Sequence, residues 1–352
     1  MQPRIIETKT YKVFGNLIGL INPSVSCATA KTFGIILLNY IYKRSNFLFL
    51  LNMQNQITRT PLQKILHFFI TKMIIATALI IALVAIVEWL RSSLLDATNL
   101  TNDTKALITS VTEAFLATAG YILLFKKYER RRIYELSTAT FFSNATIGFL
   151  TGILLQALFI LVIFLTGTFI VVGINPVSTL MTPFAFALTA GFVAEIIMIG
   201  VVFRLLEQQT GTAIGIFIFV ILFAVLHINV KGANIISVGA TAMQAGLLLP
   251  AAYVFARNLW LPIFLHFGWD FAEPGIFGCI NPSSSLTQGL MKSKIGGNSI
   301  FTGGITGPQD SLTSLLVCLV LGLIFLSIAK RQNNIIKPVW KAQATDNSTI
   351  KL

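Results

Sequence analysis

One apolar stretch decides the fold: Gly-Phe-Val-Ala-Glu-Ile-Ile-Met-Ile-Gly-Val-Val-Phe-Arg, residues 191–204. It places a carboxylate, Glu195, inside a run that is long and apolar enough to cross a bilayer. A carboxylate at the centre of a membrane helix costs about 2.5 to 3.5 kcal/mol even on mild scales, and such residues usually face a polar cavity. Glu195 is therefore the first candidate functional residue.

Two of the three histidines of the chain follow Glu195 in apolar runs. His227 ends Phe-Ala-Val-Leu-His, residues 223–227, and His266 lies in Leu-Trp-Leu-Pro-Ile-Phe-Leu-His-Phe-Gly-Trp-Asp, residues 259–270. His266 and Asp270 share a helix face, so the carboxylate can accept from the imidazole and fix its tautomer. We expect Glu195, His227, His266 and Asp270 to enclose one water. Glu195 would take its proton, and an imidazole N–H would stabilise the oxyanion on a peptide carbonyl.

The composition indicates a polytopic helical membrane protein. The 352 residues are 55% hydrophobic and 11% charged, with a mean hydropathy of +0.79, which is too apolar for a soluble domain. The net charge of +13 comes from Lys and Arg residues beside apolar spans, where they set topology, so nucleic-acid binding is not expected. The three cysteines, Cys27, Cys279 and Cys318, have no CxxC spacing and indicate neither a zinc site nor a disulfide framework.

Eight apolar runs predict an all-α bundle of about eight transmembrane helices. They are residues 66–90, 106–125, 146–173, 179–206, 212–229, 234–256, 259–272 and 311–329. We divide the chain into an N-terminal extension, 1–60, that is poorly ordered or interfacial, a transmembrane domain, 61–332, and a cytoplasmic tail, 333–352. Met53 is a second candidate for the true start, because a polar, Gln-rich segment and then an apolar helix follow it.

Basic residues predict the orientation. The richest basic loop is 126–132, and Lys330, Arg331 and Lys337 follow the last run. Both regions should face the cytoplasm, which fits both termini inside. The polar, Gly- and Ser-rich stretch 273–310 would then face outside, and connections of that length are usually functional or disordered.

Plainer roles compete with the functional ones. Glu195 could instead be a buried acid that pairs with Arg204 or a tyrosine. His227 could instead be a donor in an interhelical hydrogen bond. Glu113, in the second run, has no His or Asp at helical spacing and is interpreted as structural. The cluster 129–132, Glu-Arg-Arg-Arg, is interpreted as a solvated, lipid-facing anchor.

The order of these motifs resembles the CAAX protease and bacteriocin-processing family of intramembrane proteases, also called CPBP or Abi. The likeness rests on a Glu-bearing membrane helix, Phe-x-x-x-His at 223–227, and Leu-Trp-x-Pro-x-x-x-His-x-x-Trp-Asp at 259–270. It runs from about Tyr121 to Ser327 and includes 128–137 and the Gly-Gly-Ile-Thr-Gly-Pro stretch 303–308. The resemblance implies an eight-helix bundle with a membrane-buried site, where paired glutamates activate water and two histidines and an Asn or Asp assist.

Three departures from the family pattern bear on activity. Its first motif reads Glu-Glu-x-x-x-Arg, but here Ala194 replaces the first Glu and Ile199 the Arg, and Gln309 stands where relatives often carry Glu. Replacing a buried ion pair by apolar groups is often neutral or stabilising. The fold should therefore survive while the chemistry weakens.

Three functions fit these residues. The first is a CAAX-protease-like intramembrane endopeptidase with a Glu-activated water, acting on a membrane-associated peptide or protein in the lipid bilayer. The second is a pseudoprotease that binds a membrane peptide or partner, and the third is a transporter with Glu195 and Asp270 as a proton relay, which the lack of inverted repeats disfavours. No cofactor is implied, and zinc has no spacing signature here, although a metal stays open. We expect an integral protein of the plasma membrane.

Overall fold

The computed structural model describes residues 68–230, 232–279, 286 and 288–339. From Phe69 to residue 339 these described residues belong to one compact unit. The predicted extension 1–60 and the alternative start at Met53 lie outside the described residues, as does the tail from residue 340 onward.

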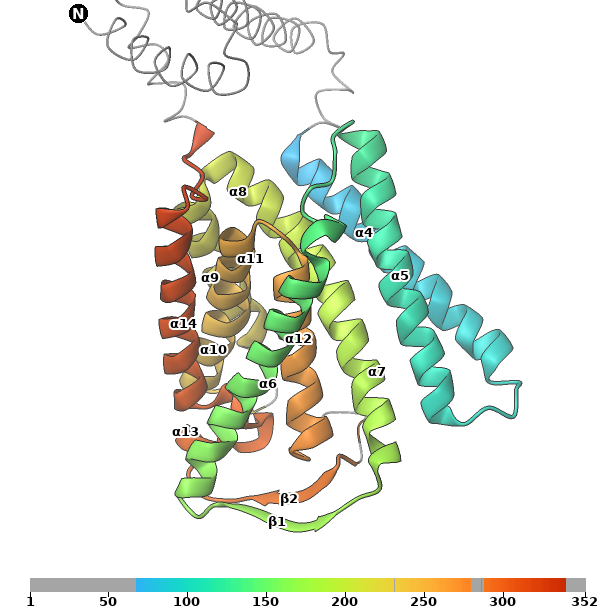
Figure 1. The fold of residues 1–352 in the computed structure, drawn as a ribbon, viewed down its shortest axis with the longest axis vertical. Coiled ribbons are helices and arrows are strands. Elements are labelled where there is room, and N and C mark those ends of the chain that lie inside the picture. Colours follow the sequence, from blue (N-terminus) through green and yellow to red (C-terminus); the bar gives the residue numbers. More distant parts are fainter. Residues whose placement is uncertain (1–67, 231, 280–285, 287, 340–352) are drawn as a thin grey trace, which may run out of the picture. The chain divides into compact units, whose positions relative to one another are not determined.

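Helices dominate the described chain (Figure 1). The α-helices are α4 (Phe69–Leu90), α5 (Asn102–Tyr128), α6 (Phe141–Leu165), α7 (Met181–Thr189), α8 (Arg204–Thr210), α9 (Thr212–His227), α10 (Ile235–Thr241), α11 (Leu249–Ala256), α12 (Trp260–Phe271), α13 (Ser299–Thr302) and α14 (Leu312–Arg331). π-Helical segments extend them at Arg91–Leu95, Ala190–Ala194, Ile196–Phe203, Ala242–Leu248 and Ala272–Ile276. Two short strands, β1 (Phe169–Ile174) and β2 (Met291–Ile295), pair antiparallel from Phe169 opposite Ile295 to Ile174 opposite Met291.

The prediction of an all-α polytopic membrane protein is confirmed. Six helical stretches of the described residues are long and apolar enough to cross a membrane: Phe69–Leu95, Asn102–Tyr128, Thr138–Leu165, Val177–Thr210, Ile235–Ala256 and Leu312–Arg331. At the fifth and seventh predicted runs lie the shorter helices α9 and α12. The number of eight crossings stays a prediction.

Two predicted segments differ from the structure. The third apolar run was expected to continue to residue 173, but its helix ends at Leu165 and Phe169–Ile174 is strand β1. Gly167, with φ +74°, turns the chain, and the Phe-Ile-Val-Val run then suits a strand. The stretch 273–310, interpreted as a connection, contains β2 and α13, and β2 lies beside β1 at one end of the bundle (Figure 1).

Side-chain caps fix where several helices begin. Thr101 accepts from the backbone N–H of Thr104 at the start of α5. Asn234 begins α10 with a capping box, and Ser311 accepts from Ser314 N–H at the start of α14. These oxygens satisfy N–H groups that the first turn leaves without partners.

Three glycines bring α6 and α12 into close contact. A Cβ on Gly148, Gly152 or Gly268 would lie 2.5, 2.2 or 2.3 Å from a backbone oxygen of the facing helix. Only glycine allows backbones to approach so closely, which is how helices commonly pack within membranes. This contact fixes the position of α12, the helix that carries His266 and Asp270, against α6.

Candidate active site

Glu195 lies where a long helix changes its winding. α7 continues through Ala190–Ala194 and Ile196–Phe203 into α8, and Glu195 stands between the two π-helical segments. Such segments are rare and frequently occur at functional sites. The Glu195 side chain is buried, with 2% of the residue exposed.

His266 lies between two carboxylates. Its Nδ1 is 2.8 Å from Oε1 of Glu195, and its Nε2 is 3.3 Å from Oδ2 of Asp270 on the next turn of α12. Because both ring nitrogens face a carboxylate oxygen, either the ring is an imidazolium that donates twice or one carboxyl group carries the proton. The three groups therefore form one proton-sharing unit.

The backbone brings this unit together. Gly191, one turn before Glu195, faces α12, and a Cβ on it would lie 2.9 Å from the carbonyl oxygen of Ile263 and from Cβ of Phe267. A larger residue would push α7 away from α12. The short distance between Glu195 and His266 thus depends on a glycine that carries no chemistry itself.

A small cavity of about 60 Å³ borders His266 and Asp270. Its other polar lining residues are Gln244, Trp269 and Gln309. Trp269 donates from Nε1 to Oε1 of Gln309 at 3.1 Å, and Gln244 donates to the backbone oxygen of Gln309 and to Ser314. The remaining walls are aliphatic, and the polar groups lie on one part of a space that has room for one or a few waters.

Glu195 stands behind His266 rather than on the wall of this cavity. Its Oε2 is buried and has no hydrogen-bond partner among the described residues. Asp270, in contrast, lines the cavity directly. Of the two carboxylates, Asp270 is therefore the one that a water in the cavity would meet.

His227 lies apart from this unit. Its Nδ1 is 3.0 Å from the carbonyl oxygen of Phe223 on its own helix, and its ring stacks on that of Phe223. Among the polar contacts of the described residues, none joins His227 to Glu195 or His266. Burial raises the pKa of Asp310, although hydrogen bonds from Thr306 and Thr241 and the proximity of His227 act to lower it.

The geometry and the family comparison point the same way. Residues 176–272 match the family model Rce1-like, described as type II CAAX prenyl endopeptidase Rce1-like. Residues 176–272 are therefore similar to this family and are called the Rce1-like segment below. The match confirms the CPBP resemblance, and it contains Glu195, His227, His266 and Asp270. The searches of curated proteins and of solved structures found no match.

The Rce1-like segment therefore holds all four predicted site residues, and the structure places three of them in contact. The catalytic roles given to Glu195, His227, His266 and Asp270 stay predictions. The plainer alternative for Glu195, a pair with Arg204 or a tyrosine, is not what the structure has, because His266 is its partner.

Sequence reasoning missed several polar residues around the Rce1-like site. Gln309 was noted only as a departure, and Trp269 only as part of a motif. Gln244 and Gln156 each interrupt an apolar run, which is the one signal that the sequence offered for them. Glu273 was assigned to the connection after the seventh run, although it lies on the same helical path as Asp270, in Ala272–Ile276.

The interpretation of 129–132 as a solvated, lipid-facing anchor is wrong for two of its members. Glu129 and Arg131 join a partly buried ion-pair network, in which 10% of the Glu129 side chain and 26% of the Arg131 side chain are exposed. Glu129 pairs with Lys72 and Arg204 at 3.2 Å each and with Arg131 at 2.6 Å. Arg131 also pairs with Glu135, which accepts from Tyr121 at 2.5 Å. Arg204 is 3% exposed, and a buried guanidinium is strongly destabilising unless carboxylates pair with it. The loop 129–135 contains those carboxylates.

Glu113 has the structural contacts that the sequence suggested. It is 3% exposed and accepts from Thr189 on α7 at 2.7 Å. It lines a cavity of about 490 Å³ among α4, α5 and α7, whose walls include Lys105 and Arg91 but not His266. Glu113 is thus a buried membrane carboxylate outside the proton-sharing unit.

Within the described residues, no group of three or more His, Cys, Asp or Glu side chains is arranged to hold a metal ion. Glu195, His266 and Asp270 contact one another instead, with the imidazole in the middle. That no cofactor is implied stays a prediction from the sequence.

Proposed function

We propose that the protein is an intramembrane endopeptidase of the CAAX-protease type, which hydrolyses a peptide bond in a membrane-associated substrate. One observation carries the proposal: His266 is held between Glu195 and Asp270 at the wall of a cavity large enough for water. The Rce1-like match supports the same reaction class. The substrate is a peptide anchored in the bilayer, because the site lies on apolar helices.

The carboxylate that meets the water is Asp270. As the water oxygen attacks the peptide carbonyl carbon, one water proton passes to Asp270, and an N–H of His266 stabilises the oxyanion. Asp270 then returns the proton to the amide nitrogen, the C–N bond breaks, and an acid and an amine result. Glu195 holds the ring in place throughout. The sequence had assigned the base to Glu195, and its burial behind His266 favours Asp270 instead.

Variants of the three residues test the reaction. The probe is a farnesylated peptide that ends in a CAAX sequence, presented in lipid nanodiscs, and the readout is the rate of product formation. We expect Asp270→Asn and His266→Ala to lower the rate about 100- to 10,000-fold, the range typical of general acid–base groups. Glu113→Gln, which neutralises another buried carboxylate, is the matched control and should cut at the native rate.

A pseudoprotease is the second candidate. Ala194 and Ile199 favour it, because both positions of the family motif are apolar and Ile199, 1% exposed, belongs to the filled core. This function requires that the farnesylated peptide binds while no variant-sensitive cleavage occurs. Binding without cleavage that depends on His266 would thus replace the first proposal by the second.

A further inference from the structure

Glu273 is a buried carboxyl group that the proposed reaction does not yet use. It lies one turn beyond Asp270 and is 4% exposed. Its Oε2 accepts from Nε2 of Gln156 on α6 at 2.6 Å. Burying a carboxyl group without an ion pair is costly, and among the described residues Glu273 has no salt bridge. The burial of Glu273 therefore needs an explanation.

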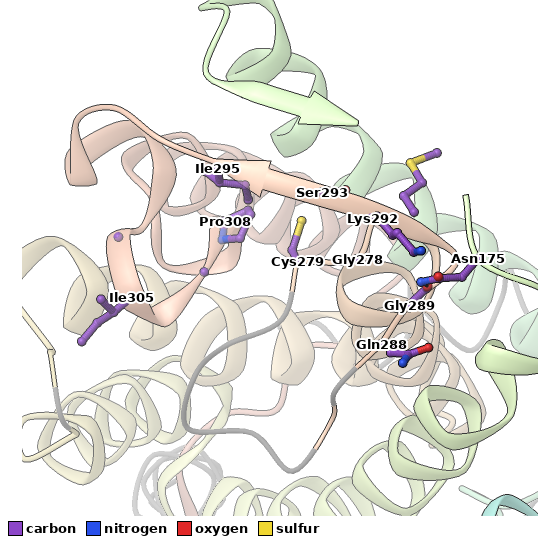
Figure 2. Close-up of a pocket in the computed structure, with 13 residues that line it drawn as sticks. Asn175, Gly278, Cys279, Gln288, Gly289, Lys292, Ser293, Ile295, Ile305 and Pro308 are labelled. Atoms are coloured by element: carbon purple, nitrogen blue, oxygen red, sulfur yellow. The ribbon is translucent and has the colours of Figure 1, made fainter. Parts of the chain in front are cut away.

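The cavities around Glu273 connect it to the site. A cavity of about 200 Å³ is lined by Asp270, Glu273 and Gln309, and it shares Asp270 and Gln309 with the cavity beside His266. It also shares Cys279 with a cavity of about 650 Å³, here called the vestibule, which lies below β2 (Figure 2). Glu273 thus lines a cavity that borders both Asp270 and Cys279, and Cys279 also lines the vestibule.

The loop 303–308 is shaped around this carboxyl group. Gly307 has φ +100°, and a Cβ on it would lie 2.4 Å from Oε1 of Glu273. A side chain at this position is excluded both by the backbone conformation and by the carboxyl oxygen. The Gly-Pro step that the sequence singled out therefore makes room for Glu273.

Gln156 suits both protonation states of Glu273. Its amide donates to the carboxylate through Nε2, while its own Oε1 is buried and has no partner among the described residues. If Glu273 gains a proton, rotation of the amide lets Oε1 accept from it. Glu273 can exchange a proton without losing this contact.

We propose that Glu273 is the second carboxyl group of the active site and exchanges with Asp270, through water in the shared cavity, the proton that the hydrolytic water releases. It occupies the role left empty by Ala194, from a different helix. The step is balanced: the proton moves from water to Asp270, on to Glu273, and back through Asp270 to the amine. Glu273 acts through Asp270, so it is a positioning residue for the reaction, and the inference rests on the proposed function.

The kinetic experiment compares Glu273→Gln, Glu273→Asp and the control Glu113→Gln on the farnesylated CAAX peptide. We expect Glu273→Gln to lower kcat about 10- to 100-fold, less than a directly acting base, with KM little changed and the pH profile of kcat displaced. Glu273→Asp should recover part of the rate. An unchanged rate and pH profile in Glu273→Gln, or an equal loss in Glu113→Gln, would overturn the inference.

A second measurement does not need cleavage. Infrared difference spectra between acidic and alkaline buffer should contain a carboxylic-acid band that disappears in Glu273→Gln, persists in Glu113→Gln, and moves in Asp270→Asn. If the band responds to these changes as expected but the protein cleaves no peptide, Glu273 is coupled to Asp270 and the proposed function is wrong. If Asp270-dependent cleavage is present but no band responds to both changes, the inference about Glu273 fails alone.

Discussion

At the scale of single residues, chemistry in this protein concentrates on one imidazole. His266 has a carboxylate on each ring nitrogen, and only one of them, Asp270, borders the water-sized cavity. An imidazole held on both sides keeps one orientation before substrate arrives, with Nε2 on the side of Asp270. An N–H at Nε2 becomes free to stabilise an oxyanion once Asp270 has taken up a proton.

The two positions that depart from the family motif predict an asymmetric response to mutation. Ile199 is 1% exposed inside the main core, so Ile199→Arg alone buries an unpaired guanidinium and should destabilise the protein by several kcal/mol. Ala194→Glu adds a second carboxylate beside Glu195, and the double change supplies each new charge with a possible partner. We expect the thermal unfolding midpoint of the double variant to lie above that of Ile199→Arg. A double variant less stable than both single variants would show that the charges do not pair.

At the scale of elements, the contact between α6 and α12 sets the site. Gly152 has backbone atoms of α12 within 2.2 to 3.0 Å of a hypothetical Cβ, so Gly152→Ala forces the helices apart. Overpacking of this kind costs about 1 to 3 kcal/mol or more. We expect a lower unfolding midpoint and reduced cleavage, because His266 moves with α12. Gly296→Ala, where a Cβ meets nothing within 4 Å, is the control and should change neither.

The loop after α5 predicts an acid-sensitive stability. Burial alone would raise the pKa of Glu135, but hydrogen bonds from Arg131 and Tyr121 hold it below its ordinary value of 4.5. A lowered folded-state pKa means that the stabilisation is fully present above about pH 4.5 and is lost as the pH falls through the folded value. Unfolding of the native protein should therefore become easier below that pH. The effect should shrink in Glu135→Gln, and equal pH dependence in both proteins would contradict the assignment.

Several of these features could be predicted from the sequence, and there are physical reasons why the others could not. Hydropathy and helical spacing predicted the bundle and the His266–Asp270 face, because both depend on local periodicity. Glu273 and Gln156 are 117 positions apart and meet only through tertiary packing, so no local pattern could pair them. Arg204 and the loop 129–135 also meet only through tertiary packing. From the sequence alone, the charges of this loop resemble a solvated anchor.

At the scale of the whole molecule, the basic loop after α5 and the cavities beyond α12 lie toward different ends of α12. The network around Glu129 and Arg204 lies near the start of α12, where Leu259 N–H donates to the backbone oxygen of Glu135. The β1–β2 pair lies toward the other end of that helix (Figure 1). Glu273 follows the same end of α12 in Ala272–Ile276, and β2 lines the vestibule. The vestibule therefore lies away from the basic loop.

This arrangement predicts a topology that labelling can check. By the positive-inside rule the basic loop and the end of α14 face the cytoplasm, so Gly297 and the vestibule face outside. Single cysteines at Arg132 and at Gly297, in a variant without the three native cysteines, should react with a membrane-impermeant thiol reagent from opposite sides of sealed cells. Reaction of both from the same side would contradict the orientation.

The most direct test of the account is the fate of the oxygen atom of water. The purified protein is incubated with the farnesylated CAAX peptide in water labelled with heavy oxygen, and the products are weighed by mass spectrometry. We predict one heavy oxygen in the new carboxyl group when the native protein or Glu113→Gln cuts the peptide, and no labelled product with Asp270→Asn or His266→Ala. Peptide that stays intact with the native protein, or labelled product that forms equally well without His266, would contradict it.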